Sequence, residues 1–313
     1  MATVVQYQEL GGPEVLELVE VPTPHASEGE LVVEVRAAGV NPIDWKLRRG
    51  IRGGHLTEPR RVGSDGGGVV VEVGYSVDGW SVGDEVVIVN ANGAYATHLV
   101  VTPKQIVPKP ANISFEEAAA IGIPVSTAYQ ALRSLGVEDG TTLLIHGGSG
   151  AVGHAAVQFA TAWGATVIAT ASERNHARLR ELGAIPVAYG PGLVERVREA
   201  APQGIDRVLD AVGTDEALEA SFALVEDRQH IGTIVVGAKA ADLGIQAWSG
   251  GNPLPLTEQE QAWRAEAIPA VAELAEHNGF SFELGTVRPL SEAAEAHRES
   301  ESGHPSGKLI LVP

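Results

Sequence analysis

Cysteine is absent from this sequence of 313 residues. Without it the chain can form no disulfide, and it has neither a thiolate nucleophile nor a thiolate ligand for a metal ion. Three histidines fall in the first third of the chain, His25, His55 and His98, but their spacing is not typical of a metal site. We therefore expect no metal ion.

Positive charge is scarce. The chain has 22 Lys and Arg residues against 40 Asp and Glu residues, which gives a formal net charge of −18. A surface of this sign repels the phosphates of nucleic acids and the anionic leaflet of a membrane, so we expect neither as a partner. An anionic cofactor needs local help, from helix dipoles and a few well-placed cations.

Long apolar runs are also missing. No stretch approaches the roughly 18 consecutive apolar residues of a membrane span. Residues 1–21 contain no basic segment followed by a long apolar one, so they do not resemble a signal peptide. From these absences we expect a cytoplasmic protein.

The chain is long enough for two lobes, because single cores stop growing at roughly 250–300 residues. Residues 1–110 contain short β-branched runs, such as 31–40 and 84–89, separated by Gly-rich and Pro-rich stretches. From residue 114 onward helical patterns appear and then alternate with strand patterns. This alternation predicts an α/β fold in which helices cover both faces of a doubly wound parallel sheet.

A glycine motif marks one turn of that sheet. Gly148, Gly150 and Gly153 fit G-x-G-x-x-G, after an expected strand at 141–146 and before an expected helix. In this context glycines allow a tight turn and a close approach of the backbone to a pyrophosphate, while the helix amino terminus supplies N–H groups. The motif therefore predicts a dinucleotide site.

The end of the next strand bears on which dinucleotide binds. An NAD-preferring site usually has an acidic residue there for the ribose hydroxyls, but this chain has Ser172 followed by Glu173 and Arg174. A hydroxyl and a guanidinium suit a 2′-phosphate, which favours NADPH. Glu173 opposes this interpretation, because an acidic side chain next to Ser172 could take the place usual in NAD-preferring sites. The alternative for Arg174 is that its side chain is only solvated at the surface and binds no phosphate.

Eight stretches in order resemble the medium-chain dehydrogenase/reductases of the zinc-independent quinone oxidoreductase branch. They are AAGVNPIDWKLRRG (37–50), VGSDGGGVVVEVG (62–74), VGDEVV (82–87), GAYATHLVV (93–101), IGIPVSTAYQAL (121–132), LIHGGSGAVG (144–153), LDAVG (209–213) and GKLILV (307–312). The resemblance implies a GroES-like β-rich catalytic domain over 1–123 and 285–313. It also implies a Rossmann domain over 124–284 that binds NADPH.

The resemblance also implies site residues. Asn41 and Asp44 of NPID match the segment that faces the nicotinamide and substrate, where Asn41 donates to the acceptor oxygen; the alternative is a turn. Thr127 matches a contact of the nicotinamide, although a threonine inside a helix also bonds back to a carbonyl. The expected catalytic residues are Asn41, Asp44 and Thr127, and the expected cofactor-binding residues are Thr127, Gly148, Ser149, Gly150, Ala151, Val152, Gly153, Ser172, Arg174, Tyr189 and Val212.

The same resemblance bears on the reaction. Asn41 stands where a zinc-binding relative carries its first cysteine, and residues 90–98 are too short for a structural-zinc loop. Without a Lewis acid, alcohol oxidation is disfavoured, so we expect hydride transfer from NADPH to a quinone or an α,β-unsaturated carbonyl. The alternatives are a biosynthetic or enoyl-reductase-like enzyme acting on a thioester or natural-product intermediate, and a non-catalytic NADPH-binding protein.

A strand expected over 279–290 concerns assembly. We place it at the open edge of the Rossmann sheet, where Phe280 and Phe282 share one face. Relatives close that edge across a two-fold axis, and such an interface is the commonest closed arrangement. We therefore expect a homodimer with a continuous sheet through this segment.

Overall fold

The computed structural model describes residues 1–51, 56–277, 279–303 and 307–313. The chain forms two compact units, Met1–Ile123 with Ile268–Pro313, and Pro124–Ala267. The first unit thus includes residues 268–284, which the sequence analysis assigned to the Rossmann domain. Helices α3 (Gly122–Ser134) and α9 (Glu258–Glu276) each contain residues of both units.

The first unit is rich in β structure, as the sequence predicted. One sheet has the order β2-β1-β4, and a larger one has the order β15-β16-β3-β5-β6-β8 with β7 paired to β3. The strands are β1 (Ala2–Tyr7), β2 (Glu17–Val21), β3 (Leu31–Gly39), β4 (Arg60–Arg61), β5 (Asp65–Val73), β6 (Glu85–Ile88), β7 (His98–Val101), β8 (Ile106–Pro108), β15 (Leu284–Pro289) and β16 (Lys308–Val312). Leu31, Val33 and Val35 of the central strand β3 are at most 2% exposed and contribute to the core of this unit.

Three short helices accompany these sheets: α1 (Pro42–Arg48), α2 (Phe115–Ala118) and α10 (Ala293–Glu301). Helix α1 begins where the sequence favours it, because proline suits the first helical position and a carboxylate suits the first turn. Asp44 accepts a hydrogen bond from the backbone N–H of Asn41 at 2.8 Å, which satisfies a donor at the helix start.

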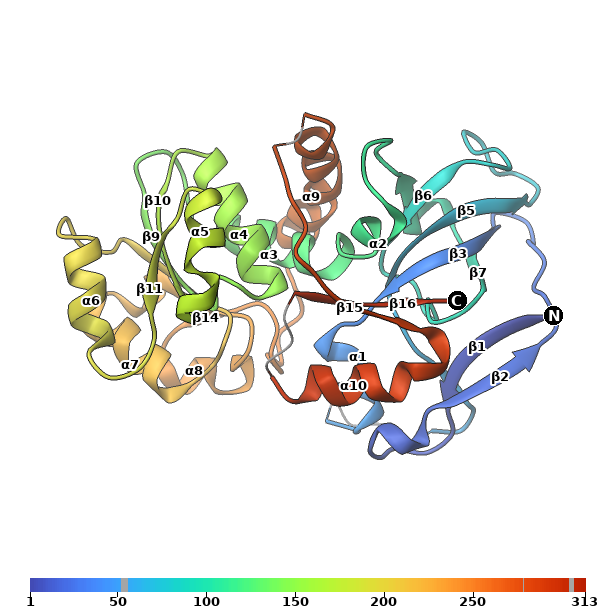
Figure 1. Ribbon diagram of the computed structural model, residues 1–313, viewed down its shortest axis with the longest axis horizontal. Coiled ribbons are helices and arrows are strands. Elements are labelled where there is room, and N and C mark those ends of the chain that lie inside the picture. The colour runs from blue at the N-terminus through green and yellow to red at the C-terminus, as the bar shows by residue number, and fades with distance from the viewer. Residues whose placement is uncertain (52–55, 278, 304–306) are drawn as a thin grey trace. The chain divides into compact units, whose positions relative to one another are not determined.

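The second unit contains the predicted doubly wound sheet. Its six parallel strands have the order β11-β10-β9-β12-β13-β14, and the direction of winding changes between β9 and β12. Helices α4 and α5 lie on one side of the strands, and α6, α7 and α8 lie on the other (Figure 1). Because both faces are covered, β9 is buried along its whole length. The predicted fold class is confirmed.

The bounds of the elements in the second unit follow the predicted alternation. The strands are β9 (Thr142–His146), β10 (Thr166–Ala171), β11 (Ile185–Ala188), β12 (Arg207–Asp210), β13 (Ile231–Thr233) and β14 (Gln246–Ala247). The helices are α4 (Ala151–Ala162), α5 (His176–Glu181), α6 (Leu193–Ala200), α7 (Asp215–Leu224) and α8 (Ala240–Leu243). In the part of the chain that the structure describes, no helix has the length and apolar character needed to cross a membrane.

The prediction of a strand over 279–290 at the edge of the Rossmann sheet is wrong in two respects: where the strand starts and which sheet it joins. Strand β15 begins only at Leu284, and it pairs in parallel with β16 at the edge of the first unit's large sheet. The sheet of the second unit instead ends at β14. Phe280 and Phe282 do pack together, with ring centroids 5.3 Å apart, but outside a strand. Their spacing alone did not reveal which sheet the following strand joins, because strand pairing is decided by distant residues.

Candidate functional site

The glycine turn follows β9 and is tightly constrained. Gly147 has a φ of +83°, which other residues rarely adopt. A Cβ on Gly148 would lie 2.7 Å from Cβ of Ala169, and one on Gly153 would collide with the carbonyl oxygen of Gly147. At Gly150 a Cβ would have an ordinary contact of 3.5 Å. The motif therefore located the turn correctly, but the strict requirements fall on Gly147, Gly148 and Gly153.

Helix α4 presents its amino terminus at this turn. Gly150 caps the helix, and the first intrahelical hydrogen bond runs from the N–H of His154 to the carbonyl of Gly150 at 2.7 Å. The N–H groups of Ala151, Val152 and Gly153 precede that bond and have no acceptor within the helix. Such N–H groups and the positive end of the helix dipole fit a phosphate group.

Ser172 and Arg174 lie just after β10, at the same edge of the sheet. Ser172 caps a short 3-10 helix, Glu173–Asn175, and its hydroxyl accepts a hydrogen bond from the side chain of Asn175 at 3.2 Å. Arg174 is exposed and makes no ion pair with any residue that the structure describes. A guanidinium in this position is available to an anionic group.

Two apolar side chains are exposed at this edge. Tyr189 directly follows β11 and is 58% exposed, and Val212 lies two residues after β12 and is 40% exposed. The loops after β9 and β12 meet, because a Cβ on Gly147 would lie 2.6 Å from Cγ1 of Val212. Ligands of doubly wound sheets bind outside the carboxyl ends of strands where the winding changes, so these apolar surfaces lie where a ligand would cover them.

Thr127 and His146 are buried. Thr127 lies inside α3 and is 5% exposed. His146 ends β9, and its Nε2 lies 3.1 Å from Oγ of Ser221. Burial lowers the pKa of His146 to about 4, although Asp210 opposes this shift, so the imidazole is neutral at pH 7. His146 is thus held inside its own unit, between the end of β9 and Ser221.

The first unit holds a second group of polar side chains, which we call the buried polar cluster: Asn41, Asp44, Asp65, Tyr95 and Lys308, each at most 4% exposed. Nδ2 of Asn41 donates to Oδ2 of Asp65 at 2.7 Å, and Oδ1 of Asn41 accepts from Nζ of Lys308 at 2.5 Å. The hydroxyl of Tyr95 donates to Oδ2 of Asp44 at 2.9 Å. Lys308 also lies 3.8 Å from the carboxylate of Asp65.

Burial dominates the electrostatics of this cluster. It raises the pKa of Asp44 to about 7, despite the hydrogen bonds from Asn41 and Tyr95. It also raises the pKa of Asp65, although the ammonium of Lys308 acts in the opposite direction. Burial likewise lowers the pKa of Lys308 and raises that of Tyr95 well above its usual value. The cluster can therefore hold or release a proton near neutral pH at Asp44.

The cluster contains both catalytic residues expected in this unit, Asn41 and Asp44, together with three that were not expected as site residues: Asp65, Tyr95 and Lys308. The amide of Asn41 is engaged at both ends, by Asp65 and Lys308, and its side chain is 1% exposed. Lys308 and Tyr95 were not singled out from the sequence. A signal for Lys308 was present, because a lysine among the apolar residues of GKLILV requires a partner when it is buried.

Within the described residues, we find no set of side chains arranged as ligands of a metal ion. Zinc sites of dehydrogenases use thiolate and imidazole ligands, and this sequence has no cysteine. Among the residues that the structure describes, no group of three or more His, Asp or Glu side chains is arranged to hold a metal. His55 lies outside the described residues.

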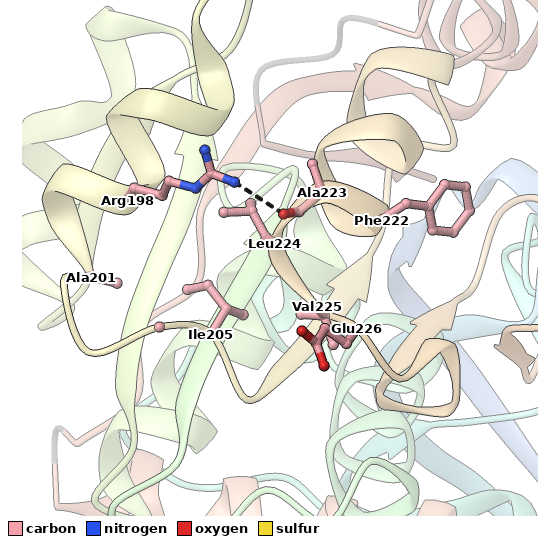
Figure 2. Close-up of a pocket in the computed structure, with 9 residues that line it drawn as sticks. Arg198, Ala201, Ile205, Phe222, Ala223, Leu224, Val225 and Glu226 are labelled. Carbon is pink, nitrogen blue, oxygen red and sulfur yellow. Dashed lines mark hydrogen bonds between the residues drawn. The ribbon is translucent and has the colours of Figure 1, made fainter.

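A pocket is present elsewhere in the second unit. It lies between the end of α6 and the end of α7, and Arg198 reaches the carbonyl oxygen of Ala223 at 3.3 Å beside it (Figure 2). Its lining residues Ala201, Gly204 and Ile205 lie in the segment that leads into the amino end of β12, whereas the glycine turn lies at the carboxyl end of β9. The pocket contains none of the predicted site residues.

Comparisons with known proteins agree with this architecture. Residues 27–111 match the family model of the alcohol dehydrogenase GroES-like domain, and residues 151–250 match that of the zinc-binding dehydrogenases. A quinone oxidoreductase of Pongo abelii is 30% identical over 98% of this chain and 97% of its own length. The chain belongs to the quinone oxidoreductase branch of the medium-chain dehydrogenase/reductase superfamily. The resemblance inferred from the sequence is thereby confirmed.

Solved quinone oxidoreductases have the same fold. That of Coxiella burnetii superposes with a TM-score of 0.83 at 30% identity, covering 100% of this chain and 99% of its own. That of Escherichia coli, solved in complex with NADPH, superposes with a TM-score of 0.84 at 27% identity, covering 99% of this chain and 100% of its own. These likenesses extend over both units of the chain.

Proposed function

We propose that the chain is an NADPH-dependent reductase that transfers hydride to a quinone or an α,β-unsaturated carbonyl without zinc. The observation that carries this proposal is membership of the quinone oxidoreductase branch in a chain whose Gly147–Gly153 turn is shaped for a dinucleotide phosphate. The NADPH found in the Escherichia coli relative supports the choice of cofactor.

The chain's own residues suit this cofactor. The N–H groups at the start of α4 would bind the pyrophosphate, and Ser172 with Arg174 would bind the 2′-phosphate. Tyr189 and Val212 would lie against the bound molecule, which would cover their exposed apolar surface. When bound, NADPH supplies the hydride, and the protein supplies binding and orientation.

We assign catalytic roles to Asn41 and Asp44 in the first unit and to Thr127 in the second unit, each taken within its own unit. Nδ2 of Asn41 carries two hydrogens, of which one is donated to Asp65 at 2.7 Å. The other is donated to the carbonyl oxygen of Gly39 in a long hydrogen bond of 3.5 Å, and the residue is 1% exposed. For Asn41 to donate to an acceptor oxygen on which negative charge develops, this hydrogen must leave Gly39 and become accessible when the substrate binds. Asp44 accepts from the backbone N–H of Asn41 and so holds that residue in place.

The donor set supports a reaction without zinc. No thiolate exists in the chain, so a zinc ion would have to be held by oxygen and imidazole ligands alone. Without a Lewis acid, a substrate that carries its own electron sink is the better hydride acceptor, because it stabilises the product charge itself. Quinones and conjugated enones have this property, whereas simple alcohols and ketones lack it.

The decisive experiment measures NADPH oxidation by the purified protein against a panel of quinones, conjugated enones, enoyl thioesters and simple ketones. We expect turnover with quinones or enones and none with simple ketones. Turnover confined to enoyl thioesters would instead support the biosynthetic alternative. NADPH binding without turnover of any acceptor would support a non-catalytic role.

We also propose a homodimer. Strand β15 lies at an edge of the large sheet of the first unit, and its Val287 is 47% exposed. An exposed edge strand presents unpaired backbone groups that a second copy of the chain can pair with. A two-fold interface is the commonest way to close such an edge.

A further inference from the structure

Four neighbouring strands of the second unit carry polar side chains in one row at their carboxyl ends. Thr170 of β10 pairs in register with His146 of β9, His146 pairs with Asp210 of β12, and Asp210 pairs with Thr233 of β13. We call these four residues the polar row. All are at most 3% exposed. Residues in register on parallel strands point to the same face, so the row crosses the point where the winding changes.

Asp210 binds the backbone of the loop that follows its own strand. Its Oδ1 accepts hydrogen bonds from the N–H of Val212 at 3.1 Å and from the N–H of Gly213 at 2.8 Å. Its Oδ2 accepts a hydrogen bond from the hydroxyl of Thr233 at 2.7 Å. One carboxylate thus fixes the loop after β12 and ties it to the end of β13.

Thr233 does the same for the next loop. Its Oγ1 accepts from the N–H of Val235 at 3.1 Å and from the N–H of Val236 at 3.2 Å, while its own hydrogen goes to Asp210. The two loops are packed together as well, because a Cβ on Gly213 would lie 2.6 Å from Cγ1 of Val235. Gly213 has a φ of +71°, so its backbone shape is also restricted to glycine.

These side-chain contacts come in addition to the backbone pairing that joins the strands. Buried carboxylates and hydroxyls cost free energy unless hydrogen bonds compensate them. Here the compensating bonds go to the loops that leave the sheet. Since Val212 also lies against Gly147 of the glycine turn, fixing the loop after β12 fixes one side of that turn.

We propose that Asp210 and Thr233 are positioning residues for NADPH, which hold the loops at 211–213 and 234–236 in the conformation that binds the cofactor. This inference rests on the proposed function. The two residues do not touch the cofactor themselves, since both are 0% exposed. They act through the N–H groups that they bind.

The test is a fluorescence titration of the purified full-length chain with NADPH. Thr233→Val keeps the shape of the side chain but removes the hydroxyl, and we expect it to raise the Kd for NADPH at least tenfold. Thr233→Ser keeps the hydroxyl and should stay within threefold of the wild type. With saturating NADPH, kcat of Thr233→Val should fall less than threefold, so that the loss appears in binding.

Thr142→Val is the matched control. Thr142 is the first residue of β9 and so lies at the amino ends of the strands, whereas the polar row lies at their carboxyl ends. It is 5% exposed and accepts a hydrogen bond from Gln203 at 3.4 Å. We expect it to lower the Tm but to leave the Kd for NADPH within twofold. If Thr142→Val weakens binding as much as Thr233→Val does, the effect is one of general stability and the inference is wrong.

Two further outcomes are decisive. Should Thr233→Val fail to fold, Asp210→Ala takes its place, because it removes the acceptor of the Val212 and Gly213 N–H groups and of the Thr233 hydroxyl. A Kd for this variant equal to that of the wild type would overturn the inference. Absence of NADPH binding by the wild type would overturn the proposed function, and the inference with it.

Discussion

The ammonium group of Lys308 donates to the amide oxygen of Asn41 at 2.5 Å, although 267 positions separate the two residues in the chain. This bond fixes the orientation of the Asn41 amide, because a lysine only donates and therefore selects the oxygen. With the oxygen bound, Nδ2 must face Asp65. The last strand of the chain thus determines which way the residue that caps α1 presents its amide hydrogens.

Lys308→Met tests the energetic weight of this contact. The variant leaves the buried carboxylate of Asp65 without its cation, so we expect the free energy of unfolding to fall by about 3–5 kcal/mol. Urea unfolding at pH 7 measures the change. The control, Lys104→Met, removes an exposed lysine and should alter stability by less than about 0.5 kcal/mol. Equal losses in the two variants would contradict a special role for Lys308.

The raised pKa of Asp44 makes the free energy of unfolding depend on pH. Its pKa is about 7 in the folded protein against 3.8 in the reference state, so the folded protein holds this proton more tightly. The protonated carboxyl of Asp44 contributes roughly 4 kcal/mol to the free energy of unfolding. This contribution is fully present below about pH 4 and is lost as the pH rises to about 7. Unfolding measured between pH 4 and pH 8 tests this. The difference in stability between wild type and Asp44→Asn should change over that range, and a constant difference would refute the prediction.

Metal removal tests the zinc-free reaction. The chain has no cysteine, so no thiolate site can be emptied by a chelator. We expect dialysis against a strong chelator to leave the rate of NADPH oxidation unchanged within the error of the assay. A zinc-dependent alcohol dehydrogenase treated in parallel serves as the control and should lose activity. Loss of activity that zinc restores would rule out the zinc-free proposal.

The parts of the site that the sequence predicted are those built from neighbouring residues. Gly148 and Gly153 lie in one turn, and the packing that requires them comes from Gly147 and from the adjacent strand. A local pattern therefore carries the information. Gly147 was missed because the motif does not include it, although its positive φ makes it as restricted as its neighbours.

The parts that the sequence did not predict depend on distant partners. A lone lysine in GKLILV does not indicate that its partner is Asn41, and a strand pattern near residue 284 does not indicate that β16 is its neighbour. The polar row is similar, since Asp210 and Thr233 meet only because β12 and β13 pair in register. Pairing of this kind is selected by the whole core and not by the segments themselves.

Arg174→Ala tests cofactor preference. We expect the wild type to bind NADPH at least tenfold more tightly than NADH, a difference of about 1.4 kcal/mol. Because only NADPH carries the 2′-phosphate, the variant should weaken NADPH binding and leave NADH binding unchanged. Arg180→Ala, which removes another exposed arginine of the same region, is the control and should change neither value. Equal affinities of the wild type for the two cofactors would remove the basis for choosing NADPH.

Sedimentation of the purified chain at micromolar concentration tests assembly, and we expect a homodimer. Val287→Lys places a charge on the exposed edge strand β15, where it opposes pairing with a second strand, so this variant should sediment as a monomer. Val82→Lys is the control, because Val82 is also exposed, at 66%, but lies in the turn before β6. It should remain dimeric. A monomeric wild type would exclude the dimer, and a dimeric Val287→Lys variant would show that the interface lies elsewhere than along β15.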